Sequence, residues 1–303
     1  MKINYTSEVK QALEQKRPVV ALESTIITHG MPWPQNYEMA QKVEATVREN
    51  GATPATIAVI EGEIYVGLTA ETLEALAKTQ DALKLSRADL AICMAKGLTG
   101  ATTVAATMII ANLAGISVFA TGGIGGVHRG AELSFDISAD LQELAQTPVS
   151  VVAAGPKAIL DIPKTLEVLE TLGVPVIAFG QDDLPAFWSR SSGLQAPLRM
   201  DTARDIARAH EIRKTLGLPG GQLIANPVPL NKEIPKDHID PIIQVALEEA
   251  EKRNISAKKV TPFLLTRILE LTDGRSLDTN IALVLNNARL AAEIASEHSM
   301  LGQ

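Results

Sequence analysis

One lysine in this sequence stands where a nucleophile could be held. Lys157 follows the turn Gly155-Pro156, which comes after the apolar run Val149–Ala153. Burial disfavours the ammonium form of a lysine, and a neutral amine that points into a crevice is a nucleophile near neutral pH. A solvent-facing lysine at the start of a helix fits the same position, and the residues alone leave both interpretations open.

A carboxylate ends the first apolar run of the chain. Glu23 follows Pro18–Leu22 and precedes Ser24-Thr25. A glutamate at a strand end suits general acid chemistry when burial keeps it protonated. It suits equally a structural carboxylate that accepts backbone hydrogen bonds. His29, in the same loop, is predicted to be a structural histidine that makes hydrogen bonds.

The segment 121–132, TGGIGGVHRGAE, combines a glycine-rich turn with positive charge. Four of the residues 122–126 are glycines, which lets backbone N–H groups approach an anion, and His128 and Arg129 follow. We therefore predict a phosphate or carboxylate site here, with a tight turn carrying surface charges as the alternative. A dinucleotide fingerprint does not fit, because His128 stands where the third glycine of GxGxxG would be.

Three oxygen-bearing residues alternate just after this loop. Asp136, Ser138 and Asp140 share one face of an extended stretch and could bind a hard cation such as Mg²⁺ or Mn²⁺. Alternatively, Ser138 is the N-cap of a helix with Asp140 in its first turn. Both interpretations hold if only Asp136 meets the metal. The five histidines show no HExxH-like spacing, which argues against a zinc site.

The elements that must position these residues alternate between strands and helices. Met39, Val43 and Val47 share one helical face, and 102–114 is predicted to be a helix rich in small residues. Strand–helix alternation predicts a layered α/β fold in which strand-end loops converge on a ligand crevice. Buried strands are predicted at Pro18–Leu22, Ala55–Ile60, Leu90–Ala95, Ile116–Ala120, Val149–Ala153, Val174–Phe179 and Gln222–Ala225, and C-terminal helices at Pro241–Arg253, Pro262–Leu271 and Leu277–Glu297.

Size and composition narrow the class of protein. The chain has 303 residues, 46% of them hydrophobic and 21% charged, which is typical of a compact protein with a sizeable core. No linker divides it, so one domain spanning 1–303 is expected. A net charge of -7 argues against nucleic acid as a partner. Neither a secretory signal nor a membrane-spanning run is present, so a cytoplasmic location is expected, and the single cysteine, Cys93, is predicted to be buried.

Four long stretches resemble one known family. They are VVALESTIITHGMPWPQN (19–36), GATTVAATMIIANLAGI (100–116), VFATGGIGGVHRGAELSFDISADLQELA (118–145) and AAGPKAILDIP (153–163). The chain is similar in these stretches to the pseudouridine-5'-phosphate glycosidases, also called the indigoidine synthase A-like family. The similarity continues through Asn226, TPFLL at Thr261 and the segment Asn280 to Ile294, so it covers nearly the whole chain.

The resemblance implies a fold and site roles for this chain. The fold would be a three-layer α/β/α arrangement with a central mixed sheet and a helical C-terminal part, in a homotrimer. Glu23 would be the proton donor, Lys157 the covalent nucleophile and Asp136 the ligand of one Mn²⁺. The implied substrate-binding residues are Lys84, Val104, Ser138, Ala139 and Asp140, with His128 and Asn280 as further pocket residues.

The activity implied by the resemblance is hydrolysis of a C-glycoside. Pseudouridine 5'-phosphate and water would give uracil and ribose 5-phosphate through an adduct on Lys157. Two other functions would use the same features: a Schiff-base sugar-phosphate aldolase or lyase, or a nucleotide-binding module whose glycine loop holds phosphate without chemistry.

Overall fold

The apolar runs of the sequence form the middle of one mixed sheet. The computed structural model describes residues 2–253, 255 and 260–301, so the ends of the predicted 1–303 domain lie outside the described residues. Within this part, the order of the main path is β1-β4-β3-β2-β7-β8-β11-β9-β10, and β6 pairs with β3 and β5. The strands from β3 to β10 along this path are parallel, whereas β4 and β6 run antiparallel to β3.

The strands are short and lie between longer helices. They are β1 (Ile3–Tyr5), β2 (Val19–Leu22), β3 (Thr53–Ile60), β4 (Glu63–Val66), β5 (Leu83–Leu85), β6 (Gly100–Thr102), β7 (Val118–Ala120), β8 (Ser150–Ala153), β9 (Val176–Phe179), β10 (Leu198–Met200) and β11 (Gln222–Ala225).

The helices include three near the C-terminus, as predicted. They are α1 (Ser7–Glu14), α2 (Thr25–Thr28), α3 (Gln35–Glu49), α4 (Ala70–Lys78), α5 (Arg87–Ala95), α6 (Val104–Leu113), α7 (Ala131–Ser134), α8 (Ala139–Gln146), α9 (Ile162–Thr171), α10 (Ala203–Thr215), η1 (Leu230–Lys232), α11 (Lys236–Lys252), α12 (Val260–Leu271) and α13 (Arg275–Leu301). None of these described helices has the length and apolarity needed to cross a bilayer.

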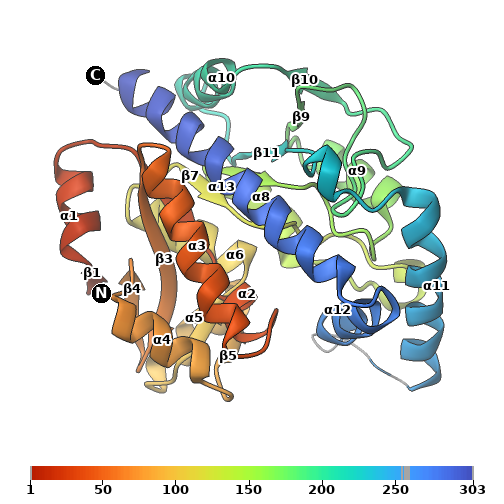
Figure 1. Cartoon of the computed structure of the whole chain (residues 1–303). Coiled ribbons are helices and arrows are strands. Elements are labelled where there is room, and N and C mark those ends of the chain that lie inside the picture. Colours follow the sequence, from red (N-terminus) through yellow and green to blue (C-terminus); the bar gives the residue numbers. More distant parts are fainter. Residues whose placement is uncertain (1, 254, 256–259, 302–303) are drawn as a thin grey trace.

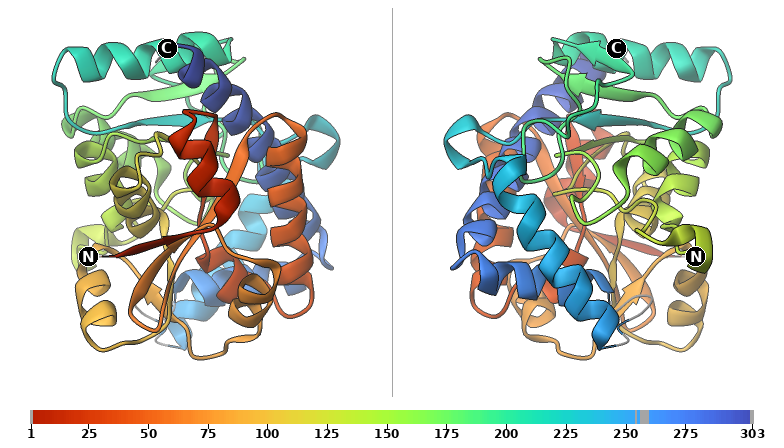
Figure 2. Two further views of the ribbon diagram at one scale, coloured as in Figure 1. Left: turned by 90° about the vertical axis from the view of Figure 1, so that its left-hand side faces the viewer. Right: turned by 90° about the vertical axis from the view of Figure 1, so that its right-hand side faces the viewer.

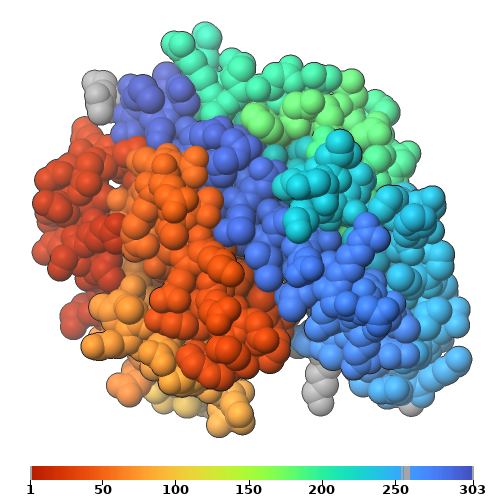
Figure 3. All heavy atoms as spheres, viewed as in Figure 1, coloured from red at the N-terminus to blue at the C-terminus, as the bar shows by residue number. Residues whose placement is uncertain are grey.

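The sheet is covered on both faces, which confirms the three-layer α/β/α fold (Figure 1, Figure 2). Side chains alternate across β2: Val20 and Leu22 belong to the core shared with α3 and α13, whereas Val19 and Ala21 belong to the core shared with α6 and α8. In the space-filling view, α13 crosses the outer surface between α3 and the segment around η1 (Figure 3). The helical C-terminal part therefore covers the sheet.

Six of the seven predicted strands are strands, and one prediction is wrong. Leu90–Ala95 lies in the helix α5, where Cys93 is buried as predicted but Ile92 is 58% exposed. A short apolar run does not distinguish a buried strand from a helix. The start of α5 is fixed instead by polar residues, because the Asp89 carboxylate accepts a 2.8 Å hydrogen bond from the backbone N–H of Ser86.

The predicted helix at 102–114 begins later than expected. Residues Gly100–Thr102 form β6, and the hydroxyl of Thr103 caps α6 by accepting a hydrogen bond from the backbone N–H of Ala106. The short strands β1, β4, β5, β6 and β10 were not predicted from the sequence. Each has only three or four residues, which is too few to show an alternating pattern.

A buried histidine makes the stability of this fold depend on pH. His210 on α10 is 4% exposed, and its Nδ1 lies 3.0 Å from the hydroxyl of Ser150. Burial, and then the neighbouring His298, lower the pKa of His210 from 6.5 to about 4. Between these values the unfolded chain binds a proton that the folded chain does not, so stability is full above pH 6.5 and falls as the pH falls toward 4.

We expect this one group to remove about 3 kcal/mol from the free energy of unfolding between pH 7 and pH 4. Urea unfolding of wild type and His210→Gln at both pH values measures it as the difference in their pH dependence. His238→Gln, at an exposed position on α11, is the matched control. An identical pH dependence in wild type and His210→Gln would contradict the expectation.

Candidate active site

Three neighbouring strands end at the same edge of the sheet and carry the predicted chemistry. Leu22 of β2 pairs with Ala120 of β7, which pairs with Val152 of β8. Because these strands are parallel, the residues that follow them lie side by side. Glu23, the glycine-rich loop and the turn before Lys157 therefore meet at one point, as the sequence predicted.

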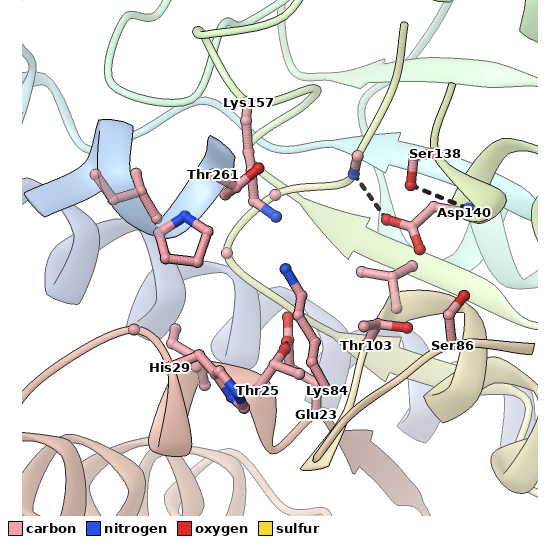
Figure 4. Close-up of a pocket in the computed structure, with 18 of the residues that line it drawn as sticks. Glu23, Thr25, His29, Lys84, Ser86, Thr103, Ser138, Asp140, Lys157 and Thr261 are labelled. Carbon is pink, nitrogen blue, oxygen red and sulfur yellow. Dashed lines mark hydrogen bonds between the residues drawn. The ribbon is translucent and has the colours of Figure 1, made fainter. Parts of the chain in front are cut away.

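A cavity of about 440 Å³ opens at this edge (Figure 4). Helices α12 and α13 form part of its wall, through Thr261, Pro262, Leu265, Asn280 and Val284. The ten site residues implied by the family resemblance all line it: Glu23, Lys84, Val104, His128, Asp136, Ser138, Ala139, Asp140, Lys157 and Asn280. The structure brings these residues together, while their roles remain predictions.

Two lysines extend into the cavity from opposite sides, with their amines toward one another (Figure 4). Lys157 is half-buried, and its backbone N–H donates a 3.1 Å hydrogen bond to the carbonyl of Ile124 in the glycine-rich loop. Lys84 comes from β5, which reaches the site through its pairing with β6. The lysine at 157 is thus part of the cavity wall rather than a solvent-facing residue.

The carboxylate of Glu23 is held by two hydroxyls. Thr25 on α2 donates to Oε2, and Thr121, directly after β7, donates to Oε1. These side chains fix the orientation of the carboxylate, and no backbone N–H of the described residues donates to it. Sequence reasoning did not assign roles to these threonines, because finding them required knowing that β2 and β7 are neighbours.

The electrostatics of the cavity keep its histidines uncharged. Burial and the nearby Lys84 lower the pKa of His29, whose Nδ1 lies 2.5 Å from the Thr28 hydroxyl, consistent with a structural hydrogen bond. Burial also lowers the pKa of His128, where Asp136 acts in the opposite direction and Lys157 adds to the lowering. At neutral pH both imidazoles therefore offer one donor and one acceptor nitrogen.

Ser138 is the N-cap of α8, which confirms the structural interpretation of this position. Its hydroxyl accepts a 3.2 Å hydrogen bond from the backbone N–H of Asp140. The Asp140 carboxylate accepts hydrogen bonds from the backbone N–H groups of Ala105 (3.1 Å) and Gly125 (2.8 Å). Asp140 thereby ties the start of α8 to the first turn of α6 and to the glycine-rich loop.

The close approach at Gly125 leads to a prediction. A Cβ at this position would overlap the Ser138 side chain and lie 2.8 Å from Oδ2 of Asp140. We expect Gly125→Ala to displace the start of α8 and to lower kcat/KM about 100-fold, since an ångström of misplacement costs that much. A steady-state assay of the hydrolysis implied by the family resemblance measures kcat/KM, and a thermal melt shows whether the variant is folded. In the same loop, the added Cβ of Gly122→Ala would come no closer than 3.2 Å to its nearest neighbour, Val284 Cγ2. Equal losses in the two variants would contradict the prediction.

The donor set fits a hydrated cation better than a closed metal site. Asp136 lines the cavity, and its carbonyl accepts a 3.0 Å hydrogen bond from the backbone N–H of His128. Among the described residues there is no group of three or more His, Cys, Asp or Glu side chains that could hold a metal ion. Mn²⁺ can be held by one carboxylate with water and substrate oxygens as its other ligands, so Asp136 fits the predicted role.

The positive charge expected from Arg129 is not part of the cavity. Arg129 is exposed and does not line it, because the chain has already turned outward at this point. The cavity instead has Lys84 and Lys157, together with the first turns of α6 and α8 at Val104 and Ala139. Helix N-termini carry partial positive charge, so the starts of α6 and α8 favour an anion on this side of the cavity.

Comparison with known proteins is consistent with this architecture over nearly the whole chain. The family model for indigoidine synthase A like proteins matches residues 8–297. Pseudouridine-5'-phosphate glycosidases from Paracoccus denitrificans and Jannaschia sp. are 71% and 65% identical to this chain, each over 97% of both chains.

Solved structures agree with the sequence comparison. The prealnumycin C-glycosynthase AlnA, in complex with ribulose 5-phosphate, superposes with a TM-score of 0.92 at 38% identity, over 99% of this chain and 98% of that one. An indigoidine synthase A-like protein from Thermotoga maritima gives a TM-score of 0.89 at 36% identity, over 98% of this chain and 96% of the other.

Proposed function

This chain belongs to the indigoidine synthase A-like family, and we propose that it is a C-glycosidase that converts pseudouridine 5'-phosphate and water into uracil and ribose 5-phosphate. The observation that carries the proposal is the presence of the Lys157 amine and the Glu23 carboxylate in one cavity. Relatives at 71% and 65% identity that bear this enzyme name support it.

The bond to be cleaved explains why a lysine is needed. Ordinary glycoside hydrolysis protonates a leaving oxygen, which a carbon–carbon bond does not offer. An amine bonded to C1' can instead donate its electron pair as the bond to the base breaks, which gives an iminium ion. A cavity built from two carboxylates alone would lack this electron donor.

The proposed reaction proceeds in three steps. Electrons from the uracil ring expel the ribose ring oxygen, which takes a proton from Glu23. The amine of Lys157 adds to C1' of the opened sugar and loses a proton. Protonation at uracil C5 then breaks the C1'–C5 bond while the nitrogen electron pair forms the iminium, which water hydrolyses to ribose 5-phosphate and free Lys157.

The phosphate is proposed to bind at the starts of α6 and α8. Val104, Ser138 and Ala139 belong to these helix ends and line the cavity, and Lys84 reaches the same space. The backbone N–H of Ser138 is used by the Gly126 carbonyl, so the N–H groups of Val104 and Ala139, the Ser138 hydroxyl and the Lys84 ammonium are the groups that suit a dianion. The reacting end of the substrate would then lie toward Glu23 and Lys157.

This phosphate site predicts a large difference between two substrates. Because remote binding energy is used to hold the sugar in register, we expect kcat/KM for unphosphorylated pseudouridine to be at least about 1,000-fold lower than for the 5'-phosphate. Chromatographic detection of uracil in the presence of Mn²⁺ tests both the function and the difference. Equal kcat/KM values would remove the proposed phosphate contribution.

The same assay separates the two other functions. Binding of pseudouridine 5'-phosphate without uracil release would indicate a nucleotide-binding module. Borohydride trapping of Lys157 by simple sugar phosphates, with no turnover of the nucleotide, would indicate an aldolase or lyase. The C-glycosynthase relative bears a name that describes formation of the kind of bond that is cleaved here. The reverse reaction, started from uracil and ribose 5-phosphate, can therefore be measured in the same assay.

Mn²⁺ is proposed to be the cofactor, held by Asp136. When bound, the ion would supply positive charge and ordered water beside the sugar phosphate. The backbone carbonyl of Asp136 accepts the hydrogen bond from the backbone N–H of His128 and so helps to position that residue.

A homotrimer in the cytoplasm is also proposed. Leu133 and Phe135, at 89% and 82% exposure, form an apolar tip next to Asp136 that a neighbouring subunit could cover. Light scattering of the purified protein measures the subunit number.

A further inference from the structure

An indole and an amide from distant parts of the chain meet beside the cavity. Nε1 of Trp188 donates a 2.7 Å hydrogen bond to Oδ1 of Asn280. Trp188 is 1% exposed, whereas Asn280 lines the cavity on α13, one turn before Val284, which lines it too. The cavity wall at this point is therefore an amide group whose other side faces a buried ring.

The loop that carries Trp188 is held firmly in place. Ala186 and Ser189 exchange backbone hydrogen bonds of 2.9 and 3.2 Å across it. The Trp188 carbonyl accepts a 3.0 Å hydrogen bond from the N–H of Ile234, and its ring packs edge-on against Phe187 at 5.0 Å. The indole N–H thus points in a fixed direction.

The partner on α13 is fixed as well. The hydroxyl of Thr279, the residue before Asn280, donates a 2.8 Å hydrogen bond to the carbonyl of Lys232. Both ends of the Trp188–Asn280 hydrogen bond are therefore anchored to the fold independently of any ligand.

This hydrogen bond decides which way the amide faces. An indole nitrogen can only donate, so the atom of Asn280 next to it must be the oxygen. A flipped amide would place two donors against each other in a buried position, which disfavours that orientation about ten- to a hundred-fold. Within the described residues Nδ2 makes no hydrogen bond, so it remains available to a ligand in the cavity.

We propose that Trp188 is a positioning residue that holds Asn280 with its NH₂ group toward the cavity, so that the enzyme accepts bases with a carbonyl oxygen at that point and rejects bases with an amino group there. The inference rests on the proposed function, since it concerns the base of that substrate. Uracil has two carbonyls and no exocyclic amine, which suits a site that offers a donor. An amino group would meet a second donor and leave both unpaired.

The experiment compares pseudouridine 5'-phosphate with two analogues, pseudocytidine and pseudoisocytidine 5'-phosphate, which carry an amino group in place of one carbonyl each. For the wild type, kcat/KM is expected to be at least about 100-fold lower with one of the two analogues than with pseudouridine 5'-phosphate. In Trp188→Phe the amide is free to rotate, so this discrimination should shrink about 10-fold, mainly through KM. Because each analogue has the same intrinsic reactivity with both enzymes, that reactivity cancels when the discrimination of the wild type is divided by that of Trp188→Phe.

Two further variants sharpen the comparison. Asn280→Asp still accepts the hydrogen bond from Trp188 but presents an oxygen to the cavity, so its preference should shift toward the amino analogue. Trp33→Phe makes the same ring change at a residue that is 44% exposed and outside the cavity lining, and it should behave as wild type.

The inference and the proposed function fail in different ways. Uracil release by wild type with no discrimination between carbonyl and amino bases, or unchanged discrimination in both Trp188→Phe and Asn280→Asp, would overturn the inference alone. Absence of uracil release by wild type would instead remove the function on which it rests. Thermal melts confirm that each variant is folded.

Discussion

Lys157→Ala is expected to abolish uracil release, with a loss of at least about 10,000-fold, because no other group would then supply the electron pair that breaks the C1'–C5 bond. The side chain is half-buried at the cavity wall and its main-chain contact to Ile124 does not involve the amine, so the fold should be retained. Single-turnover release of uracil measures the loss.

The covalent step gives a second, independent measurement. Borohydride added during turnover should reduce the iminium and leave a sugar phosphate attached to the protein, which intact-mass analysis detects. Peptide mapping must then place it on Lys157 rather than on Lys84, whose amine points toward it across the same cavity (Figure 4). Label on Lys84, or an active Lys157→Ala enzyme, would overturn the mechanism.

Lys96→Ala is the matched control for this experiment. Lys96 is exposed at the end of α5 and does not line the cavity. Its removal changes the charge of the protein by the same amount, and both uracil release and labelling should match wild type.

Glu23→Gln is expected to lower kcat about 1,000-fold, within the range for loss of a general acid. Glutamine has nearly the same shape and can still accept from one of the two threonine hydroxyls, but it has no proton to give to the ring oxygen. Rapid-quench measurement of uracil release gives the rate.

The order of steps makes the Glu23 prediction sharper. If the glutamate protonates the ring oxygen before the lysine adds, Glu23→Gln should form no borohydride-trapped adduct. An adduct that accumulates in this variant would move the role of Glu23 to a later step. Glu38→Gln, at an exposed position on α3, is the control and should keep wild-type rates.

Much of the candidate site could be predicted because its residues follow strands directly. Glu23 and Lys157 are next to or shortly after apolar runs, and the carboxyl ends of parallel strands lie at one edge. The glycine-rich loop was found from composition alone. The N-cap role of Ser138 was also available locally, because capping involves only neighbouring residues.

Other members of the site depend on contacts that no local pattern shows. Lys84 could be placed only by the resemblance to known enzymes, because β5 has three residues and reaches the cavity through its pairing with β6. Thr121 and Glu23 are 98 residues apart, and Trp188 and Asn280 are 92 apart. Arg129 was assigned to the anion site because it follows the glycines, but the chain turns outward before it.

The sequence by itself determined the alternation of buried strands and helices and the residues at each strand end, because burial periodicity, turns and caps act within a few residues. Only the tertiary structure decided which strand ends are neighbours, which hydroxyls hold Glu23 and which way the amide of Asn280 faces. Those properties depend on strand order and on side-chain packing between distant segments. The orientation of each polar side chain is fixed by a hydrogen-bond partner that is far away in the sequence, and neither partner shows this orientation by itself.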